Sequence, residues 1–469
     1  MKRFISLLMG PLLFALCYFF LPESLFATAA SRGAVGTVAW MAAWWIFAPV
    51  DYAVTAFLPI IINALLPMAS MKSVIANYSS ETILLLLGAS ILTVSWEETG
   101  LDNRIAAKCL SFIGNNFRKQ LIFFFLLSTA MSAVLPNAIV CATLTPIAVA
   151  LLKFSGHDDV SKSSVAAKLL LTIAYGVSIG GLATPLGGAM NLVTVDYIQK
   201  VTGKEFFYVD WVVKFLPAVI VLVISNIIFL IRDVSKTIVL NSTQEFFDEQ
   251  MKKQKMLTRE EIWSFALFVI AATLAFTRQF YQHILPGFKP AYAFITCAVA
   301  SFLITRRNGI RLMKWGSVQT KIIWSMIYIF AGGLALGTLL NESQATSAIG
   351  KMLVNMNLNG SILSVFIIVT MTLLLSDVTS NTATAAVCMP IVVSMCAGQN
   401  LDPIPFIFIA SIGVNISYML PTSIRAIPVG YGLSPQYMFK EGYKLTIIVI
   451  ILMSMLSWYL LNYTAWFKL

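Results

Sequence analysis

Ser376–Pro390 reads S-D-V-T-S-N-T-A-T-A-A-V-C-M-P and lies between the apolar runs Ile362–Leu375 and Ile391–Ala397. Each run is shorter than the ~20 residues that a membrane-spanning helix needs. If both runs lie in a bilayer, the polar tip has no water around it and must be buried in protein or line a polar cavity. The stretch therefore predicts a re-entrant helical hairpin. The alternative is one continuous helix whose Ser and Thr side chains bond back to carbonyls a turn earlier.

The composition places this hairpin in an all-α polytopic membrane protein, because 58% of the residues are hydrophobic and 11% are charged. A second apolar region with a polar centre, 121–153, predicts another hairpin, beside the one at 361–397. Counting both as hairpins predicts about eleven transmembrane helices. The runs long enough to span are 4–22, 33–50, 53–68, 81–97, 165–195, 208–231, 262–280, 288–305, 321–340, 404–429 and 443–466.

The positive charges predict the orientation in the membrane. The formal net charge is +11, and most Lys and Arg residues fall in loops on one side of the predicted topology. This bias predicts a cytoplasmic N-terminus in a plasma membrane, of the bacterial inner-membrane kind, and a cytoplasmic connector at 232–261. Because the basic residues are scattered between apolar runs, the partner that they indicate is the lipid bilayer and not nucleic acid.

An internal repeat relates the two hairpins. Asn137–Ile147 parallels Asn381–Ile391 at an offset of 244 residues, and the same offset relates Gly88 to Gly332 and Glu98 to Glu342. An odd number of predicted crossings between the copies makes them inverted repeats, an arrangement typical of transporters. The predicted regions are N-terminal scaffold helices at 1–120, a first-repeat transport region at 121–231, the connector at 232–261, second-repeat scaffold helices at 262–357 and a second-repeat transport region at 358–469.

Each repeat has a second interruption after its hairpin, at Ala183–Asn191 and at Leu420–Pro428. Proline and paired glycines inside apolar spans break the helix and free its backbone groups. Two hairpin tips and two broken helices give four half-helix ends that can converge at mid-membrane, and the helix N-termini among them suit anions.

The interrupted segments resemble the divalent anion/sodium symporters, a family of di- and tricarboxylate and sulfate carriers. Thr379–Pro390 is similar to the second S-N-T signature of that family, Ala174–Gly181 to the lead-in of its G-T-x-x-G-T-P-P-N element, and Gly332–Ala335 to its ninth helix. Trp44-Trp45 with Phe57–Pro59 resembles the early helices. The resemblance covers nearly the whole chain. It implies a homodimer, an elevator mechanism and a substrate held between the two hairpin tips.

The chain departs from the family at the motifs that supply sodium ligands. The first S-N-T stands here as Pro136-Asn137-Ala138, the first T-P-P-N element as Gly187–Asn191, and Arg425 falls at or beside the second asparagine position. Side-chain oxygens are lost from the first cluster, although a hard cation needs several oxygens. No cofactor is therefore expected. Sodium bound by backbone carbonyls is the alternative.

Arg425 has the most consequential of the predicted roles. A charge at bilayer depth costs at least ~2.5–3.5 kcal/mol, so it needs a partner or a cavity. It could replace a bound Na⁺ or clamp a substrate carboxylate; alternatively, it snorkels to the surface or pairs with Asp377 or Asp196. The predicted substrate-binding residues are Asn137, Ala138, Ser380, Asn381, Thr382, Thr422, Ser423 and Arg425, and the predicted cation-site region comprises Pro136, Gly187, Gly188, Asn191 and Thr379.

These patterns predict a secondary active transporter of small carboxylate anions, favoured as a sodium-independent exchanger (antiporter). The alternative is a Na⁺- or H⁺-coupled symporter of dicarboxylate, citrate or sulfate. An intramembrane enzyme is not expected, because the chain has no H-E-x-x-H motif and no plausible Ser/His pair. A channel would also fit the polar tips, but inverted hairpins and broken helices favour a carrier.

Overall fold

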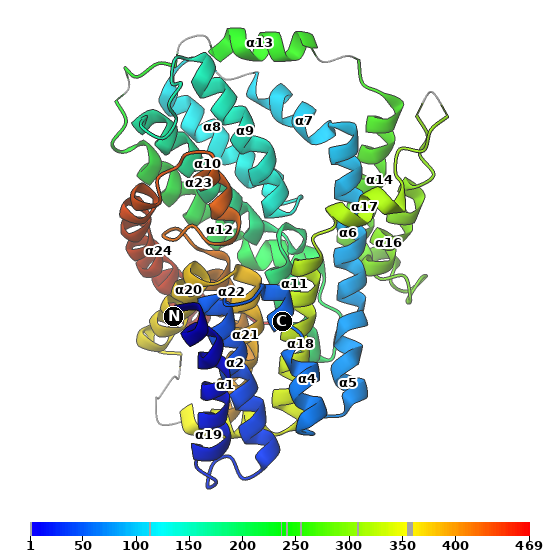
Figure 1. Ribbon diagram of the computed structural model, residues 1–469, viewed down its shortest axis with the longest axis vertical. Helices are drawn as coiled ribbons and strands as arrows, with labels where there is room; N and C mark the ends of the chain where they lie inside the picture. The colour runs from blue at the N-terminus through cyan, green and yellow to red at the C-terminus, as the bar shows by residue number, and fades with distance from the viewer. Residues whose placement is uncertain are drawn as a thin grey trace.

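The computed structural model describes residues 2–111, 114–235, 237–240, 243–253, 256–306, 309–353 and 360–469. Within these ranges the structure is helical, and its β-pairing is limited to the isolated bridges Asn116–Val239 and Thr305–Arg311. Seven helical segments in the described part are long and apolar enough to cross a membrane, and five shorter apolar helices accompany them. The predicted all-α polytopic membrane fold is therefore confirmed (Figure 1).

Both predicted hairpins are present. The first consists of α8 (Phe117–Ser132) and α9 (Asn137–Phe154), and the second of α20 (Ile362–Val378) and α21 (Asn381–Gly398). The first lies in the upper half of the molecule and the second in the lower half (Figure 1). The second arm of each hairpin begins at the asparagine of the repeat, so the same sequence position opens a helix in both halves.

Both interruptions after the hairpins are real helix breaks. In the first repeat, α10 (Ser164–Ala183) is followed by the 3₁₀ turn η2 (Pro185–Gly187) and by α11 (Ala189–Thr202). In the second, α22 (Pro403–Asn415) is followed by an extended segment, by η4 (Ser423–Arg425) and by α23 (Ala426–Gly430). Pro185 lies at the start of η2, two residues after the end of α10, where its missing N–H and fixed φ disfavour continuation of the helix. Pro421 lies in the non-helical segment before η4.

The other helices surround these interrupted elements. Before the first hairpin they are α1 (Lys2–Phe20), α2 (Ala29–Phe47), α3 (Tyr52–Thr55), α4 (Leu58–Leu65), α5 (Met71–Ala76), η1 (Asn77–Ser79), α6 (Glu81–Thr99) and α7 (Leu101–Leu110). Between α11 and the second hairpin they are α12 (Tyr208–Ile231), α13 (Thr243–Lys253), α14 (Arg259–Phe276), α15 (Arg278–Tyr281), α16 (Pro290–Ser301), α17 (Trp315–Lys321), α18 (Trp324–Glu342) and α19 (Ala345–Leu353). The chain ends with α24 (Pro435–Tyr463). The predicted connector contains α13, which crosses the upper end of the molecule (Figure 1).

Glycines allow each hairpin to pack closely on the helix that follows it. A Cβ at Gly176 of α10 would lie 2.7 Å from the carbonyl oxygen of Phe125 on α8. A Cβ at Gly413 of α22 would lie 3.0 Å from the carbonyl oxygen of Val369 on α20. Only a residue without a side chain permits such backbone approach. The two repeats therefore hold their hairpins in the same way.

Two repeat-related junctions also share one backbone conformation. Gly100 joins α6 to α7 with φ +72°, and Gln344, 244 positions later, joins α18 to α19 with φ +62°. This left-handed region is readily available to glycine and costly for other residues. In Figure 1, α7 lies near the upper end of the molecule and α19 near the lower end, as expected for repeats that run in opposite directions.

These junctions give a matched test of backbone strain. Gly100→Ala should lower the free energy of unfolding by about 1 kcal/mol, because a positive φ disfavours a Cβ. No heavy atom lies within 4 Å of that Cβ, so the loss cannot come from a clash. Gln344→Gly should be neutral within about 0.5 kcal/mol, since relief of strain offsets the added freedom of the unfolded chain. Apparent melting temperatures in detergent check both. Equal losses at the two sites would contradict the assigned conformations.

Candidate functional site

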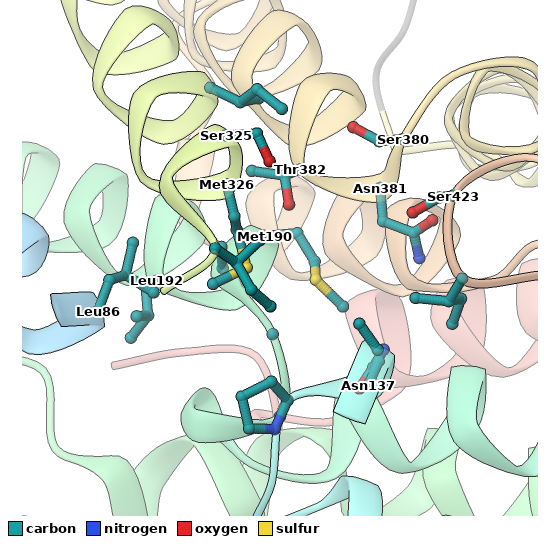
Figure 2. Close-up of a pocket in the computed structure, with 18 of the residues that line it drawn as sticks. Leu86, Asn137, Met190, Leu192, Ser325, Met326, Ser380, Asn381, Thr382 and Ser423 are labelled. Atoms are coloured by element: carbon teal, nitrogen blue, oxygen red, sulfur yellow. The ribbon is translucent and has the colours of Figure 1, made fainter. Parts of the chain in front are cut away.

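A cavity of about 250 Å³ lies where the two hairpin tips meet the first broken helix (Figure 2). Its lining comes from both repeats and from α6 and α18. The lining residues are Tyr52, Leu85, Leu86, Ala89, Ser90, Pro136, Asn137, Ala138, Leu186, Gly187, Gly188, Ala189, Met190, Leu192, Ile323, Ser325, Met326, Ile329, Ser380, Asn381, Thr382, Ser423 and Ile424. None of these residues carries a charged side chain.

Three long helices begin at this cavity. They are α9 at Asn137, α11 at Ala189 and α21 at Asn381, and all three starting residues line it. Among the described residues, no protein acceptor is found for the N–H groups of the first two residues of each helix. Helix N-termini carry about half a positive charge and present free N–H donors. The cavity is thus electropositive although it contains no Lys or Arg.

The hydroxyls at the second tip are available to a ligand. Thr382 Oγ1 and Ser325 Oγ have no hydrogen-bond partner within the described chain, and Figure 2 shows both near each other on the same side of the cavity. Ser380 Oγ accepts a bond from the N–H of Ala383 and caps α21, which leaves its hydrogen free to be donated. Asn381 is held by the protein, because its Nδ2 donates to the carbonyl of Asn415 at 3.2 Å.

The first tip is braced by its neighbours. Ser132 Oγ lies 2.5 Å from Asn137 Oδ1 and 2.9 Å from the carbonyl oxygen of Val177. Thr184 donates a hydrogen bond to the carbonyl of Ala133 at the other side of the tip. The Nδ2 of Asn137 has no partner in the described chain. With Asn137 Oδ1 turned toward Ser132, this donor is free at the cavity.

Asn191 does not line the cavity but joins the two repeats behind it. Its Nδ2 donates to the carbonyls of Gly181 and Thr184, the latter at 2.8 Å. Its Oδ1 accepts a hydrogen bond of 2.9 Å from Asn415 Nδ2, at the end of α22. Asn191 therefore donates hydrogen bonds to two carbonyls that the first helix break would otherwise leave unsatisfied.

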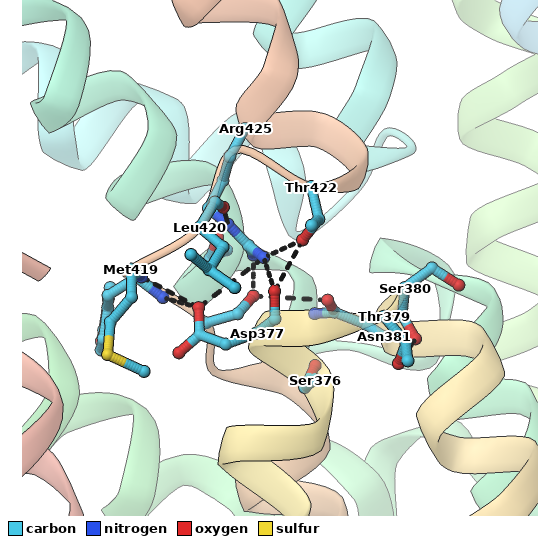
Figure 3. Close-up of polar contacts among 12 residues, drawn as sticks. Ser376, Asp377, Thr379, Ser380, Asn381, Met419, Leu420, Thr422 and Arg425 are labelled. Carbon is cyan, nitrogen blue, oxygen red and sulfur yellow. Dashed lines mark hydrogen bonds and ion pairs between the residues drawn. The ribbon is translucent and has the colours of Figure 1, made fainter. Parts of the chain in front are cut away.

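Arg425 is also outside the cavity and fully buried. Its Nε donates to the carbonyl of Leu420 at 2.7 Å, and its terminal nitrogens donate to Ser417 Oγ, to Thr422 Oγ1 at 2.6 Å and to the carbonyl of Asp377 at 3.3 Å. The carboxylate of Asp377 lies 3.7 Å from the guanidinium (Figure 3). The partner of Arg425 is therefore Asp377, one of the two acids considered from the sequence, and Asp196 is paired with Lys200 instead.

Asp377 itself organises the break after α22. Its Oδ1 accepts the N–H groups of Tyr418 and Met419 at 2.8 and 2.9 Å, and its backbone carbonyl accepts the hydroxyl of Thr422 at 2.8 Å (Figure 3). One acidic residue at the end of α20 thus ties the hairpin tip to the broken helix and to the buried arginine.

The structure brings nine of the predicted site residues to the cavity and leaves four outside it. Thr422 and Arg425 form the buried network, Asn191 the amide pair, and Thr379 bonds to Thr384 at 2.7 Å. The residues at the cavity are Pro136, Asn137, Ala138, Gly187, Gly188, Ser380, Asn381, Thr382 and Ser423. Whether each of them contacts a substrate or an ion stays a prediction.

The contribution of α6 and α18 to the cavity was not predicted from the sequence, and it includes Leu86, Ser325 and Met326. One signal was available. The repeat offset relates Leu85 to Ile329, and both line the cavity. Met190 belongs to the departing element Gly187–Asn191, and nothing in that motif predicts that its side chain lines the cavity.

This chain is similar to known proteins in sequence and in fold. Residues 42–413 match the citrate transporter family CitMHS. The chain is 27% identical over 480 residues to the sodium-dependent dicarboxylate transporter SdcS of Staphylococcus saprophyticus. The aligned region covers 98% of this chain and 91% of that protein. The chain is 28% identical over 482 residues to SdcS of Staphylococcus aureus, with the same coverage. The crystal structure of the Alcanivorax borkumensis YdaH transporter has the same fold, with a TM-score of 0.53 at 12% identity over 83% of this chain and 87% of that one.

The buried ion pair gives a double-mutant test. Arg425→Gln or Asp377→Asn alone should cost about 3–5 kcal/mol of stability, because each leaves an uncompensated buried charge. The double variant should recover a large part of that loss, since no charge remains. Apparent melting temperatures of the four purified proteins measure the coupling. Strictly additive losses would contradict the pairing.

Proposed function

The chain belongs to the citrate transporter family, and from this premise we propose that it carries di- and tricarboxylate anions across the plasma membrane by alternating access. The observation that carries the proposal is the meeting of three helix N-termini at one cavity without charged side chains. We also propose a homodimer with a cytoplasmic N-terminus and an elevator movement of the hairpins, as the family resemblance implies.

The cavity can bind carboxylates without a permanent charge at the site. Carboxylate oxygens are acceptors only, so they match backbone N–H groups, the hydroxyls of Ser380 and Thr382 and the free Nδ2 of Asn137. Partial charges at helix ends also bind an anion less tightly than a paired arginine would. A carrier needs this balance, because the substrate must leave on the other side.

We further propose that transport is sodium-independent exchange. The guanidinium of Arg425 is surrounded by oxygens from Asp377, Ser417, Leu420 and Thr422. A cluster of carbonyl, hydroxyl and carboxylate oxygens is the kind of site that holds a hard cation. Here a side chain of the protein already supplies the positive charge opposite Asp377, so no ion is needed to neutralise that carboxylate.

The first repeat supports the same conclusion by a different route. The carbonyls of Gly181 and Thr184, which the helix break would leave free for a cation, accept hydrogen bonds from Asn191. The Asn137 side-chain oxygen accepts from Ser132, and Ala138 brings no hydroxyl. Oxygens that could ligate Na⁺ are therefore occupied by donors of the protein.

The proposed exchange rests on positive charge that is fixed in the protein and cannot dissociate as a bound cation does. In an ion-coupled carrier, the cations dissociate before the empty site returns. The helix N-termini of this chain stay in place, while the Arg425–Asp377 pair is neutral as a whole, so the empty site keeps the partial positive charge of its helix ends, which an anion would compensate. Moving that site through the apolar barrier without an anion is unfavourable. Return with a second anion should therefore be faster than return empty.

Sodium-coupled symport is the second candidate function, and the names of the SdcS relatives favour it. Nearly full-length similarity makes inherited coupling a serious alternative. It would require a cation site built mainly from carbonyls elsewhere around the tips.

Uptake of labelled succinate into proteoliposomes separates the two. We expect uptake that requires internal dicarboxylate and is the same in Na⁺ and in choline buffer. Uptake into empty vesicles driven by an inward Na⁺ gradient would exclude the exchange mechanism but retain carboxylate transport. Absence of saturable carboxylate transport under all conditions would overturn the proposed function.

The ligand role of the second tip can be tested with one hydroxyl. Thr382→Val should raise the KM for succinate about tenfold or more, because a hydrogen bond to a charged group contributes about 1.5–3 kcal/mol. Thr370→Val is the matched control, since the Thr370 hydroxyl is also buried without a partner but lies on α20 away from the cavity. Saturation kinetics in proteoliposomes measure both. Equal effects of the two substitutions would argue against substrate contact at Thr382.

A further inference from the structure

The cavity has a polar side and an apolar side. Figure 2 shows Ser380, Asn381, Thr382 and Ser423 together on one side, with Leu86 and Leu192 at the opposite side. Met190 and Met326 lie between the two groups in the same view. On the apolar side, α6 supplies Leu85, Leu86 and Ala89, and α18 supplies Ile323, Met326 and Ile329.

Met190 is placed by a glycine. Its thioether lies against Gly188, at the position that a Cβ of residue 188 would occupy. The side chain is 4% exposed, so it covers the backbone just before α11 with apolar atoms. Met326 of α18, which is half-buried, lines the same cavity and lies near Met190 in Figure 2. Two flexible and polarisable side chains thus form an adaptable apolar wall opposite the hairpin tips.

This wall has little to offer a hydroxyl group on a substrate. The free donors of the hairpin tips are needed for carboxylates. Outside the tips the cavity hydroxyls belong to Tyr52, to Ser90 of α6 and to Ser325 of α18, and Ser325 lies beside Thr382 on the polar side in Figure 2. A substrate hydroxyl buried against Met190 and Met326 would lose its hydrogen bonds to water without replacement, at a cost of several-fold or more in affinity. A methyl group at the same position would gain from burial.

We propose that this site prefers carboxylates with an apolar substituent on the carbon chain over their hydroxylated counterparts. This inference rests on the proposed function and narrows its substrate class. The two hairpin tips hold the carboxylates, and the substituent points toward Met190 and Met326. A cavity of about 250 Å³ is small compared with drug-binding pockets and suits a compact metabolite of this kind.

Two pairs of anions test the preference in the wild-type protein. Methylsuccinate and malate differ in a methyl in place of a hydroxyl, and tricarballylate differs from citrate by lacking its hydroxyl. Each should compete with labelled succinate, and the less polar member of each pair should have an inhibition constant about tenfold lower. In the first pair, burial of a methyl contributes about fourfold and the avoided desolvation of the hydroxyl contributes the rest. In the second pair, the avoided desolvation acts alone.

The outcomes separate this inference from the proposed function. If no carboxylate is transported and none competes, the proposed function fails. If succinate is transported but malate and citrate compete as well as their partners or better, the inference alone is wrong. A site that hydrogen-bonds the substrate hydroxyl would reject the analogue that lacks it very strongly. Loss of that discrimination in Ser90→Ala or in Ser325→Ala would then identify the group responsible.

Substitution of the wall should change the preference in a defined direction. Met326→Gln has nearly the same length but offers a donor and an acceptor, and it should reduce or reverse the methylsuccinate-to-malate ratio. Met326→Leu, which keeps an apolar wall, should retain the ratio. Met371→Gln on α20, with a residue that is 64% exposed and outside the cavity, controls for the change in composition. A ratio that is unchanged in a folded, transporting Met326→Gln protein would overturn the role of the wall.

Discussion

Interrupted helices inside a bilayer have no water to satisfy their backbone groups, and the rest of this structure depends on that constraint. Each repeat breaks its chain at a hairpin tip and again one helix later. Part of the freed groups are bound by the protein itself. Asp377 accepts hydrogen bonds from the N–H groups of Tyr418 and Met419. Asn191 donates hydrogen bonds to the carbonyls of Gly181 and Thr184. The N–H groups that remain, at the starts of α9, α11 and α21, lie at the cavity and are available to an anion.

Backbone groups are thus divided between those that the protein binds and those left at the cavity. The ionised side chains Arg425 and Asp377 belong to the part that the protein binds, and they lie outside the cavity. Arg425 and Asp377 are fully buried and linked to each other through the segment that follows α22. A buried ion pair contributes little net stability, but the loss of one partner is costly. The pair therefore acts as an internal constraint that fixes the second tip against the broken helix. The cavity then presents only partial charges.

The interruptions were predictable from sequence because polar and helix-breaking residues stand out in an apolar chain. Asn137 and Asn381, related by the repeat, both begin helices at the cavity, and the predicted breaks after both hairpins are present. The apolar wall was not predictable. Leu86 and Met326 line a cavity, yet in sequence they look the same as side chains that face lipid. The direction of Arg425 also depends on tertiary packing, since the repeats differ in length around it and no local pattern selects between Asp377 and a substrate.

The departures of the two repeats from symmetry can be connected through the proposed function. A carrier with a built-in cation at the second tip has no need of oxygen ligands at the first. Residues there are then free to become apolar, as at Ala138 and Met190, and both now line the cavity. Loss of ion ligands and gain of an apolar wall would be two consequences of one change, because residues of the predicted cation-site region, such as Pro136 and Gly188, are next to predicted substrate-binding residues at the same cavity. In this view coupling and substrate choice cannot vary independently in this fold.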